Sequence, residues 1–187
     1  MKKINFSSDE QLMQLVQRGS EPAFNVLYER YSQRLLFFLY KMLHQDEAKA
    51  QDLLQDVFLK VVEAPEKFDV QQPFKTWVFT VAANCCRNYF RAQKTARLAN
   101  EKIIQPKSIE PVIPIQERVF EEQLQVALEH LSPVYKEVFL LKYKEGLRLK
   151  EIATVLDCPL GTVKSRLHGA TKKLAEQLAP YKAYFNH

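Results

Sequence analysis

Two sets of polar side chains in this 187-residue sequence have the types and spacing that suit binding to nucleic acids. One set lies on a helix expected after Pro159, and its outward residues are Thr162, Lys164, Ser165, Arg166, His168 and Lys172. The other is a basic run along an earlier helix, made of Arg87, Arg91, Lys94 and Arg97. Polar groups near a helix N-terminus can contact base edges and phosphates in a major groove, and a basic stripe can follow a phosphate backbone. The alternative for each set is an ordinary solvated helix face.

Catalytic and metal-binding chemistry is not indicated by any pattern in the sequence. It contains no Gly-rich phosphate loop, nucleophile elbow, HExxH segment or paired catalytic carboxylates. The three cysteines, Cys85, Cys86 and Cys158, have neither disulfide-framework nor CxxC spacing, so we expect reduced thiols that fill helical cores. His168 has no second histidine or cysteine at metal-ligand spacing. We therefore predict no enzymatic activity, no cofactor and no metal site.

The overall charge suits a nucleic-acid partner but is too mild to establish one. Lys+Arg 27 against Asp+Glu 22 gives a net charge of +5. The opening segment MKKINFSSDEQL has no apolar stretch after its two lysines, and the most apolar run, residues 35–43, is too short to span a bilayer. We expect a cytoplasmic protein without membrane insertion.

The hydrophobic pattern predicts an all-α protein. Apolar residues recur at spacings of three and four almost throughout, and the sequence has only four glycines and no Asn-Gly or Asp-Gly dipeptide. Ser8 and Gln11 have the spacing of a capping box at the start of the first helix, which should end near Gly19. Further helices are expected at residues 21–43, 46–64 and 75–98, with Pro65 ending the third helix of the chain.

These helices are expected to form two small domains joined by a proline-containing linker. Residues 1–99 make the first domain, a helical bundle. Residues 100–115 contain Pro106, Pro111 and Pro114 and no helical stripe, so they read as an extended linker. Residues 116–187 make the second domain. The linker reaches at most roughly 50 Å, so with two domain widths it can set two DNA-binding helices about two helical turns apart.

The second domain has the pattern of a helix-turn-helix. After a helix at residues 116–131, Ser132 and Pro133 predict a new helix start with a capping hydroxyl. Two further helices, at residues 149–156 and about 160–178, are separated by a short turn at residues 157–159. Ala153 is small enough to let these two helices approach one another. Their inward residues are Ile152, Leu156, Val163 and Leu167.

The sequence resembles the extracytoplasmic-function sigma factors, the group IV sigma factors of bacterial RNA polymerase. The segments AFNVLYERY, DLLQDVFLK and FKTWVFTVAANCCRNYFR resemble region 2 of that family, and LSPVYKEVFLLKY with GTVKSRL resembles region 4. The resemblance covers nearly the whole chain in the family's order. It implies a protein that binds RNA polymerase core and directs promoter recognition and transcription initiation, with an anti-sigma factor as a further partner.

The resemblance also assigns residues to polymerase binding. The family's docking helix matches the segment from Asp52 to Lys60, and the matching positions are Asp52, Leu53, Gln55, Asp56 and Phe58. An acidic, amide-bearing edge beside apolar residues is suited to a small hydrophobic centre inside a polar rim. The apolar residues of this segment can equally be core.

The two promoter elements are assigned in the same way. The loop EKFDVQQP resembles the segment that holds a base extruded from the minus-10 element, and Asn84 matches the position that reads the upstream edge of that element. The minus-10 residues are Phe68, Asp69, Asn84, Arg87, Asn88, Arg91 and Lys94. The minus-35 residues are Thr162, Lys164, Ser165, Arg166, His168 and Lys172. The aromatic Trp77 falls on the apolar face, so we expect it to pack in the core rather than stack on DNA.

Some positions depart from the family. Ala83 and Asn88 stand where arginine and aspartate are common, and Gly169 and Thr171 stand where arginine is favoured. The last two weaken the expected grip on phosphate. Two other classes remain open as alternatives: a helix-turn-helix regulator that acts without polymerase core, and a purely helical adaptor or anti-sigma-type protein. The basic run and GTVKSRL count against the second of these.

Overall fold

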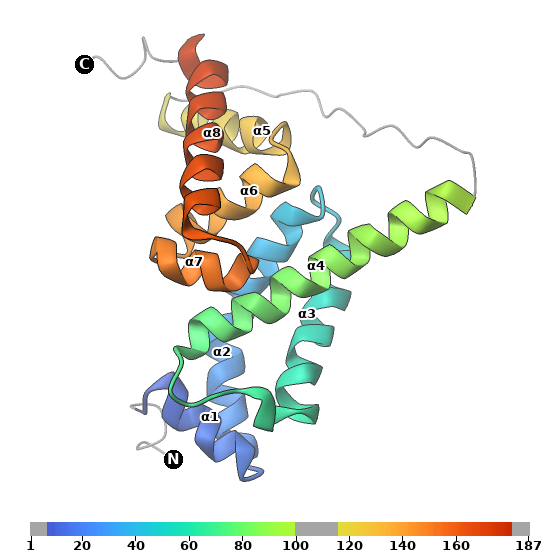
Figure 1. The fold of residues 1–187 in the computed structure, drawn as a ribbon, viewed down its shortest axis with the longest axis vertical. Helices are drawn as coiled ribbons and strands as arrows, with labels where there is room; N and C mark the ends of the chain where they lie inside the picture. Colours follow the sequence, from blue (N-terminus) through green and yellow to red (C-terminus); the bar gives the residue numbers. More distant parts are fainter. Residues whose placement is uncertain (1–6, 100–115, 181–187) are drawn as a thin grey trace.

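The computed structural model describes residues 7–99 and 116–180, with side chains described for residues 7–95 and 122–180, and every regular element in these ranges is helical (Figure 1). The all-α prediction is confirmed. In chain order the helices are α1 (Asp9–Gln17), α2 (Glu21–Met42), α3 (Glu47–Glu63), α4 (Phe74–Ala99), α5 (Gln116–Glu129), α6 (Pro133–Phe139), α7 (Leu149–Leu156) and α8 (Leu160–Leu178). A 3-10 turn occupies Pro65–Lys67, and a π-helical segment, Leu140–Lys144, extends α6. The linker expected at residues 100–115 lies outside the described ranges.

Local capping signals set the starts of the first three helices. The capping box of α1 is present, since the Ser8 hydroxyl accepts from the Gln11 N–H at 3.2 Å and the Gln11 side chain accepts from the Ser8 N–H at 3.0 Å. Ser20 and Asp46 cap α2 and α3 without the reciprocal bond, since their side chains accept from the N–H of Ala23 and Lys49. The predicted cap of α6 is wrong in one respect, because Ser132 makes no side-chain cap bond and its carbonyl accepts from the N–H of Tyr135 and Lys136 at 3.0 Å instead.

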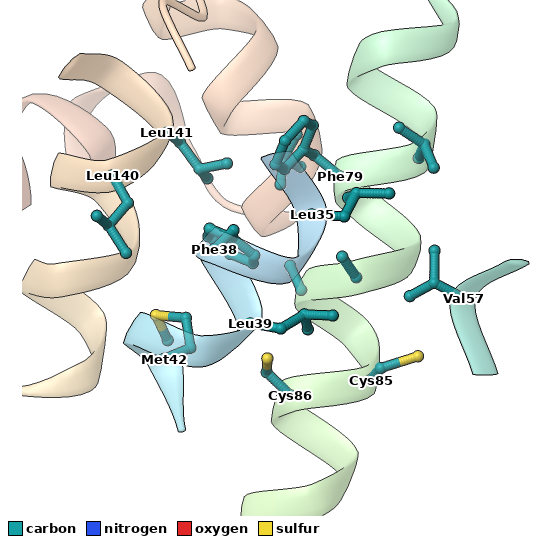
Figure 2. Close-up of a cluster of buried hydrophobic side chains, with 14 of the residues drawn as sticks. Leu35, Phe38, Leu39, Met42, Val57, Phe79, Cys85, Cys86, Leu140 and Leu141 are labelled. Atoms are coloured by element: carbon teal, nitrogen blue, oxygen red, sulfur yellow. The ribbon is translucent and has the colours of Figure 1, made fainter. Parts of the chain in front are cut away.

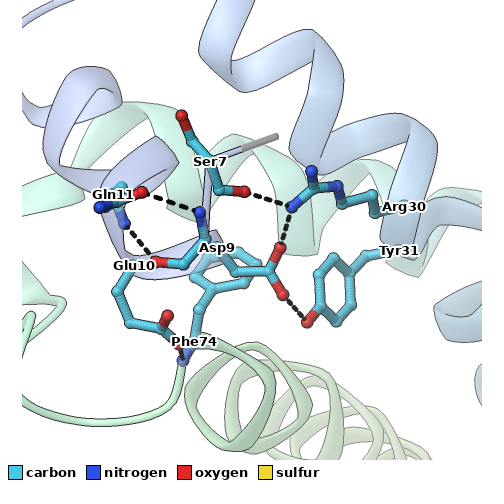
Figure 3. A network of polar contacts seen from close by, with 8 residues as sticks. Ser7, Asp9, Glu10, Gln11, Arg30, Tyr31 and Phe74 are labelled. Atoms are coloured by element: carbon cyan, nitrogen blue, oxygen red, sulfur yellow. Dashed lines mark hydrogen bonds and ion pairs between the residues drawn. The ribbon is translucent and has the colours of Figure 1, made fainter. Parts of the chain in front are cut away.

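A polar network ties α1 to the rest of the N-terminal half (Figure 3). One carboxylate oxygen of Asp9 lies 2.6 Å from the Arg30 guanidinium, and the other accepts from the Tyr31 hydroxyl. Glu10 accepts from the N–H of Phe74 at 3.0 Å and so caps the start of α4 from α1. Burial and the Asp9 carboxylate raise the pKa of Tyr31. The long helix that carries the basic run is therefore held at its first residue.

The C-terminal half is a helix-turn-helix on a two-helix support. The turn after α7 is made by Asp157, which adopts a left-handed φ of 47° and thereby redirects the chain into α8. Val155 and Val163 are fully buried where α7 and α8 pack together. The predicted helix-turn-helix and its inward face are confirmed, with Leu167 only partly buried.

The two halves pack against each other through apolar side chains (Figure 2). Phe38 and Met42 of α2 approach Leu140 and Leu141 of the π-helical segment, and all four side chains are buried. On the adjacent side, α7 packs across α4 (Figure 1). The buried side chains of both halves form one continuous cluster. Within the described ranges, no helix is long and apolar enough to cross a membrane.

Candidate nucleic-acid interface

The N-terminal part of α8 presents most of the polar set expected there. Lys164, Ser165, His168 and Lys172 are exposed, whereas Thr162 and Arg166 are partly buried. The Ser165 hydroxyl donates to the Thr162 carbonyl at 3.0 Å, so that hydroxyl is already satisfied within the helix. The basic side chains are thus the most accessible groups on this face.

Gly169 has a structural reason to lack a side chain. A Cβ placed there would lie 3.0 Å from the Tyr135 ring of α6, with no other neighbour as close. The Tyr135 ring is covered in turn by Lys173, whose ammonium lies 5.3 Å from the ring centroid. The departure from the family at Gly169 therefore reflects close packing between α6 and α8.

The second set of basic residues follows the exposed side of α4. Asn84, Asn88, Arg91 and Lys94 are exposed and recur at spacings of three and four, which places them along one broad face of the helix. The side chain of Arg97, named in the same run, lies outside the described side chains. The described part of this face can accept a phosphate backbone along about three turns of helix.

Arg87 is the exception, because other protein groups already hold its guanidinium. It lies 3.1 Å from the carboxylate of Glu137 on α6 and 3.3 Å from the carbonyl of Val155 on α7. It also donates to the side-chain oxygen of Asn84 at 2.6 Å. In this arrangement Arg87 cannot also form a full set of contacts with a phosphate.

Glu137 is the buried carboxylate at this junction. Its burial raises the pKa to about 7, although the nearby Arg87 and Arg166 act to lower it. Glu137 therefore lies within electrostatic reach of one arginine expected at each promoter element. Sequence reasoning did not single it out. The signal available was a charged pair, Lys136 and Glu137, inside an otherwise apolar helix.

The loop before α4 differs from its expected role. Phe68 is buried at 2% exposure, with its ring centroid 5.6 Å from that of Phe74 and 5.4 Å from that of Trp77. Its side chain is therefore unavailable to line a pocket for an extruded base. Asp69 is exposed and accepts from the Gln71 N–H at 2.9 Å, so it stays at the surface of the loop. The expectation that Trp77 packs in the core is confirmed.

The expected polymerase-binding segment divides into an exposed and a buried part. Asp52, Gln55 and Asp56 are exposed on α3, but Leu53 and Phe58 are 6% and 4% exposed and belong to the core. For these two residues the structure favours the alternative left open above, that the apolar residues of this segment are core.

Apolar side chains that sequence reasoning missed complete this surface. Leu59 and Val62 of α3 are 52% and 50% exposed, and Tyr28 of α2 is 43% exposed with its ring 4.7 Å from that of Phe58. Leu59 follows Asp52 and Asp56 at helical spacing on the same side of α3. We call the set Tyr28, Asp52, Gln55, Asp56, Leu59 and Val62 the α3 surface.

The cysteines occupy the positions expected of packing residues. Cys85 and Cys86 are buried in α4, and Cys158 is partly buried in the turn before α8. Burial raises the pKa of the Cys86 thiol to about 12, so it stays protonated at neutral pH. These thiols are free, as predicted.

Comparison with known families matches both halves of the chain. Residues 27–96 match the family model of sigma-70 region 2, and residues 121–174 match that of sigma-70 region 4. Among curated relatives, the RNA polymerase sigma-H factor of Pseudomonas aeruginosa is 29% identical over 183 residues, covering 92% of this chain and 94% of the relative. The ECF RNA polymerase sigma-E factor of Haemophilus influenzae is 28% identical over 185 residues, covering 92% and 96%.

Solved structures share the fold. The sigma factor RpoE of Bartonella quintana, solved in complex with the anti-sigma factor NepR, superimposes with a TM-score of 0.70 at 24% identity, covering 83% of this chain and 96% of that chain. CnrH, solved in complex with the cytosolic domain of CnrY, also gives a TM-score of 0.70, at 23% identity and covering 93% and 99%.

Proposed function

The chain belongs to the extracytoplasmic-function sigma factors, and from that premise we propose which of its surfaces bind RNA polymerase and which bind promoter DNA. As a member of this family it binds RNA polymerase core and directs transcription initiation at promoters. It acts by binding and positioning, so we assign no catalytic group. Because its partners are the polymerase and the chromosome, we propose that it works in the cytoplasm.

We propose that the α3 surface docks on the polymerase core. Its exposed leucine, valine and tyrosine can supply an apolar centre, and Asp52, Gln55 and Asp56 supply a polar rim beside it. Leu53 and Phe58 support this surface from beneath. The single observation that favours this surface is the exposure of large apolar side chains beside carboxylates on one face of α3.

The two polar faces of α4 and α8 are proposed to bind the minus-10 and minus-35 elements. On α4, Asn84 is the candidate base reader, because an amide can both donate and accept at a base edge. Asn88, Arg91 and Lys94 flank it as candidate backbone contacts. On α8, the exposed Lys164, His168 and Lys172 extend along the helix beyond its N-terminal turns. Phe68 is proposed only as support for the loop that carries Asp69.

An anti-sigma factor is the further partner that we propose. The sigma factor RpoE of Bartonella quintana, which has the same fold, was solved in complex with the anti-sigma factor NepR. The family resemblance of this chain is the main support for the same kind of partner.

Run-off transcription on genomic fragments, with purified core polymerase and this protein, tests the function directly. We expect discrete transcripts only when both components are present. The variant that combines Asp56→Arg with Leu59→Ala should lose co-purification with core, while its circular dichroism spectrum remains that of the wild type. Glu176→Arg on the exposed side of α8 is a control for reversing one surface charge.

Two outcomes would contradict these proposals. Specific duplex binding by the isolated protein, without core-dependent transcripts, would favour a regulator that acts alone. Unaltered core binding by the double variant would remove the α3 surface as the docking site and leave the family assignment intact.

A further inference from the structure

Helix α1 holds both ends of the exposed loop that precedes α4. The Gln17 side-chain amide lies 2.9 Å from two carbonyl oxygens, those of Pro65 and Phe68, and donates to both. Earlier on the same helix, Glu10 accepts from the N–H of Phe74, the first residue of α4, at 3.0 Å (Figure 3). These two side chains of α1 are about two turns apart and therefore lie on one side of the helix. One helix thus fixes both the entry to the loop and the exit from it.

Between these fixed ends, residues 69–73 form a turn that we call the loop tip. Asp69 accepts from the N–H of Gln71 with its side chain and from that of Gln72 with its carbonyl, both at 2.9 Å. A turn supported by an aspartate side chain in this way is held locally. Asp69, Gln71, Gln72 and Pro73 are exposed, so the tip presents carboxylate, amide and backbone groups to solvent.

The Gln17 bond to the Phe68 carbonyl determines where this tip points. The Phe68 ring is buried against Phe74 and Trp77, which fixes the depth of the chain just before the tip. An apolar ring contact does not fix the direction of the neighbouring peptide group, whereas a hydrogen bond to its carbonyl does. Gln17 therefore sets the direction in which the chain leaves the buried ring and enters the tip.

Other residues suffice to hold α1 against the bundle. Leu12 and Met13 are fully buried, and the Asp9 network ties the start of α1 to α2. Gln17 itself is exposed, and water can replace its amide at the Pro65 carbonyl, so losing its bonds should have little effect on stability. The position of the loop explains these bonds better than the stability of α1 does.

We propose that Gln17 and Glu10 are positioning residues for minus-10 recognition, which hold the loop tip in the orientation that receives the extruded base. This inference rests on the proposed minus-10 role of the loop that carries Asp69. Both residues act through the backbone of the loop rather than by touching DNA. A tip that is already ordered loses less conformational entropy when the base enters, and extruding that base is itself unfavourable. Loss of the two anchors should therefore weaken binding only when a base is present to be held.

Gln17→Glu in the full-length protein, assembled with core polymerase, provides the test. Glutamate has the size of glutamine, but its ionised side chain only accepts hydrogen bonds and cannot donate to the two carbonyls. Gln17→Lys keeps a donor that can reach both carbonyls and is the rescue variant. Gln14→Glu makes the same charge change at another exposed position of α1 and is the control.

The readout is the affinity of the holoenzyme for a promoter found by run-off transcription. Single abasic sites are placed in turn along the non-template strand of its minus-10 element. Removing the extruded base should weaken binding of the wild type by about tenfold. Gln17→Glu should bind the intact promoter about tenfold more weakly than the wild type does, but should bind the promoter that lacks this base equally well. At every other position, base removal should weaken both proteins by the same factor.

Further variants link this position to the loop and to the second anchor. Asp69→Ala, within the tip, and Glu10→Ala should both show a loss that depends on the same single base. Glu10→Gln keeps an acceptor for the Phe74 N–H and should behave as the wild type. Gln17→Lys and Gln14→Glu should also match the wild type at every position.

The outcomes separate failure of positioning from failure of the proposed function. If Gln17→Glu bound every promoter as tightly as the wild type, or lost the same factor on all of them including the abasic ones, the positioning inference would be overturned. A lowered unfolding midpoint in circular dichroism would identify the second case as a defect of the fold. If Asp69→Ala depended on no single base that the wild type requires, the proposed role of the loop would fail, and the inference with it.

Discussion

At the scale of single residues, the side chains of α4 differ chiefly in what already surrounds them. Arg91 and Lys94 point to solvent, whereas Arg87 is held by a carboxylate and a backbone carbonyl from the other half. Asn84 is exposed but shares its oxygen with Arg87. Of these three basic side chains on α4, Arg87 is therefore bound to other protein groups, whereas Arg91 and Lys94 are accessible. Substitutions at these positions should have different effects on DNA binding.

Asn84→Ala and Arg91→Ala should differ in how their effects depend on promoter sequence. Loss of a base contact should cost about 1–3 kcal/mol on the preferred base and little on promoters altered at that position. Loss of a phosphate contact should weaken all promoters similarly and reduce the salt slope of binding by about one. Transcription from a set of promoters mutated singly across the minus-10 element, at several salt concentrations, measures both. A uniform loss for both variants would contradict the distinction between Asn84 as a base contact and Arg91 as a phosphate contact.

At the scale of helices, two leucines of α3 lie in opposite environments. Leu53 is packed in the core, and Leu59, six positions later, is half exposed. Hydrophobic spacing predicted the helix, its start near Asp46 and its end before Pro65. It did not predict which apolar residues face inward, because the family's docking segment has leucines on both sides of the helix. The burial of Phe68 was missed for the same reason, since an aromatic residue in a polar loop can face either way.

Leu53→Ala and Leu59→Ala form a matched pair that separates stability from binding. Leu53→Ala should lower the free energy of unfolding by about 2–4 kcal/mol, because it leaves a cavity in the core. Leu59→Ala should change it by less than about 0.5 kcal/mol and should instead weaken binding to polymerase core. Urea unfolding and core pull-down measure the two effects. Equal destabilisation by the two substitutions would contradict the orientation of α3.

The anchoring of α1 gives a second prediction at this scale. Asp9→Ala should lower the free energy of unfolding by about 1–3 kcal/mol, since it removes the acceptor of both Arg30 and the part-buried Tyr31 hydroxyl. Asp69→Ala, in an exposed loop, is the control and should have a much smaller effect. Urea denaturation followed by circular dichroism compares the two. A loss no larger than that of the control would mean that the Asp9 network contributes little in solution.

At the scale of the whole molecule, the relative placement of the two halves was beyond sequence reasoning. Local signals predicted both helical sets and the proline-rich segment between them. The contact between the halves depends instead on residues far apart in the chain, such as Phe38 with Leu140 and Arg34 with Glu145. No periodicity relates such positions. The charged residues Lys136 and Glu137 are buried because both halves together cover them.

Stability should therefore depend on pH through Glu137. Its pKa is raised to about 7 in the folded protein, against about 4.5 when exposed, so between these values the folded form holds a proton that the unfolded form has lost. The free energy of unfolding should rise as the pH falls from about 7 to about 4.5, by up to about 3 kcal/mol. Above pH 7 the carboxylate is ionised in both states and this contribution is absent.

Comparing the wild type with Glu137→Gln between pH 7.5 and 5 isolates this effect. The neighbouring Cys86 thiol does not titrate in that range, because burial raises its pKa to about 12. Glu129 acts with the opposite sign and at lower pH, since its pKa of about 2 means that its contribution is lost only as the pH falls below about 4.5. Parallel stability curves for the two proteins would show that Glu137 is solvated in solution.

The apolar contact of Phe38 and Met42 with Leu140 and Leu141 has a consequence for competition between sigma factors. Any partner that separates the halves must expose this surface to water, so its apparent dissociation constant equals the intrinsic one divided by the fraction of protein already open. Each tenfold preference for the packed halves over separated halves thus costs about tenfold in apparent affinity. When several sigma factors share a limited supply of core enzyme, the contact between the halves raises the abundance that this one must reach before it gains a share.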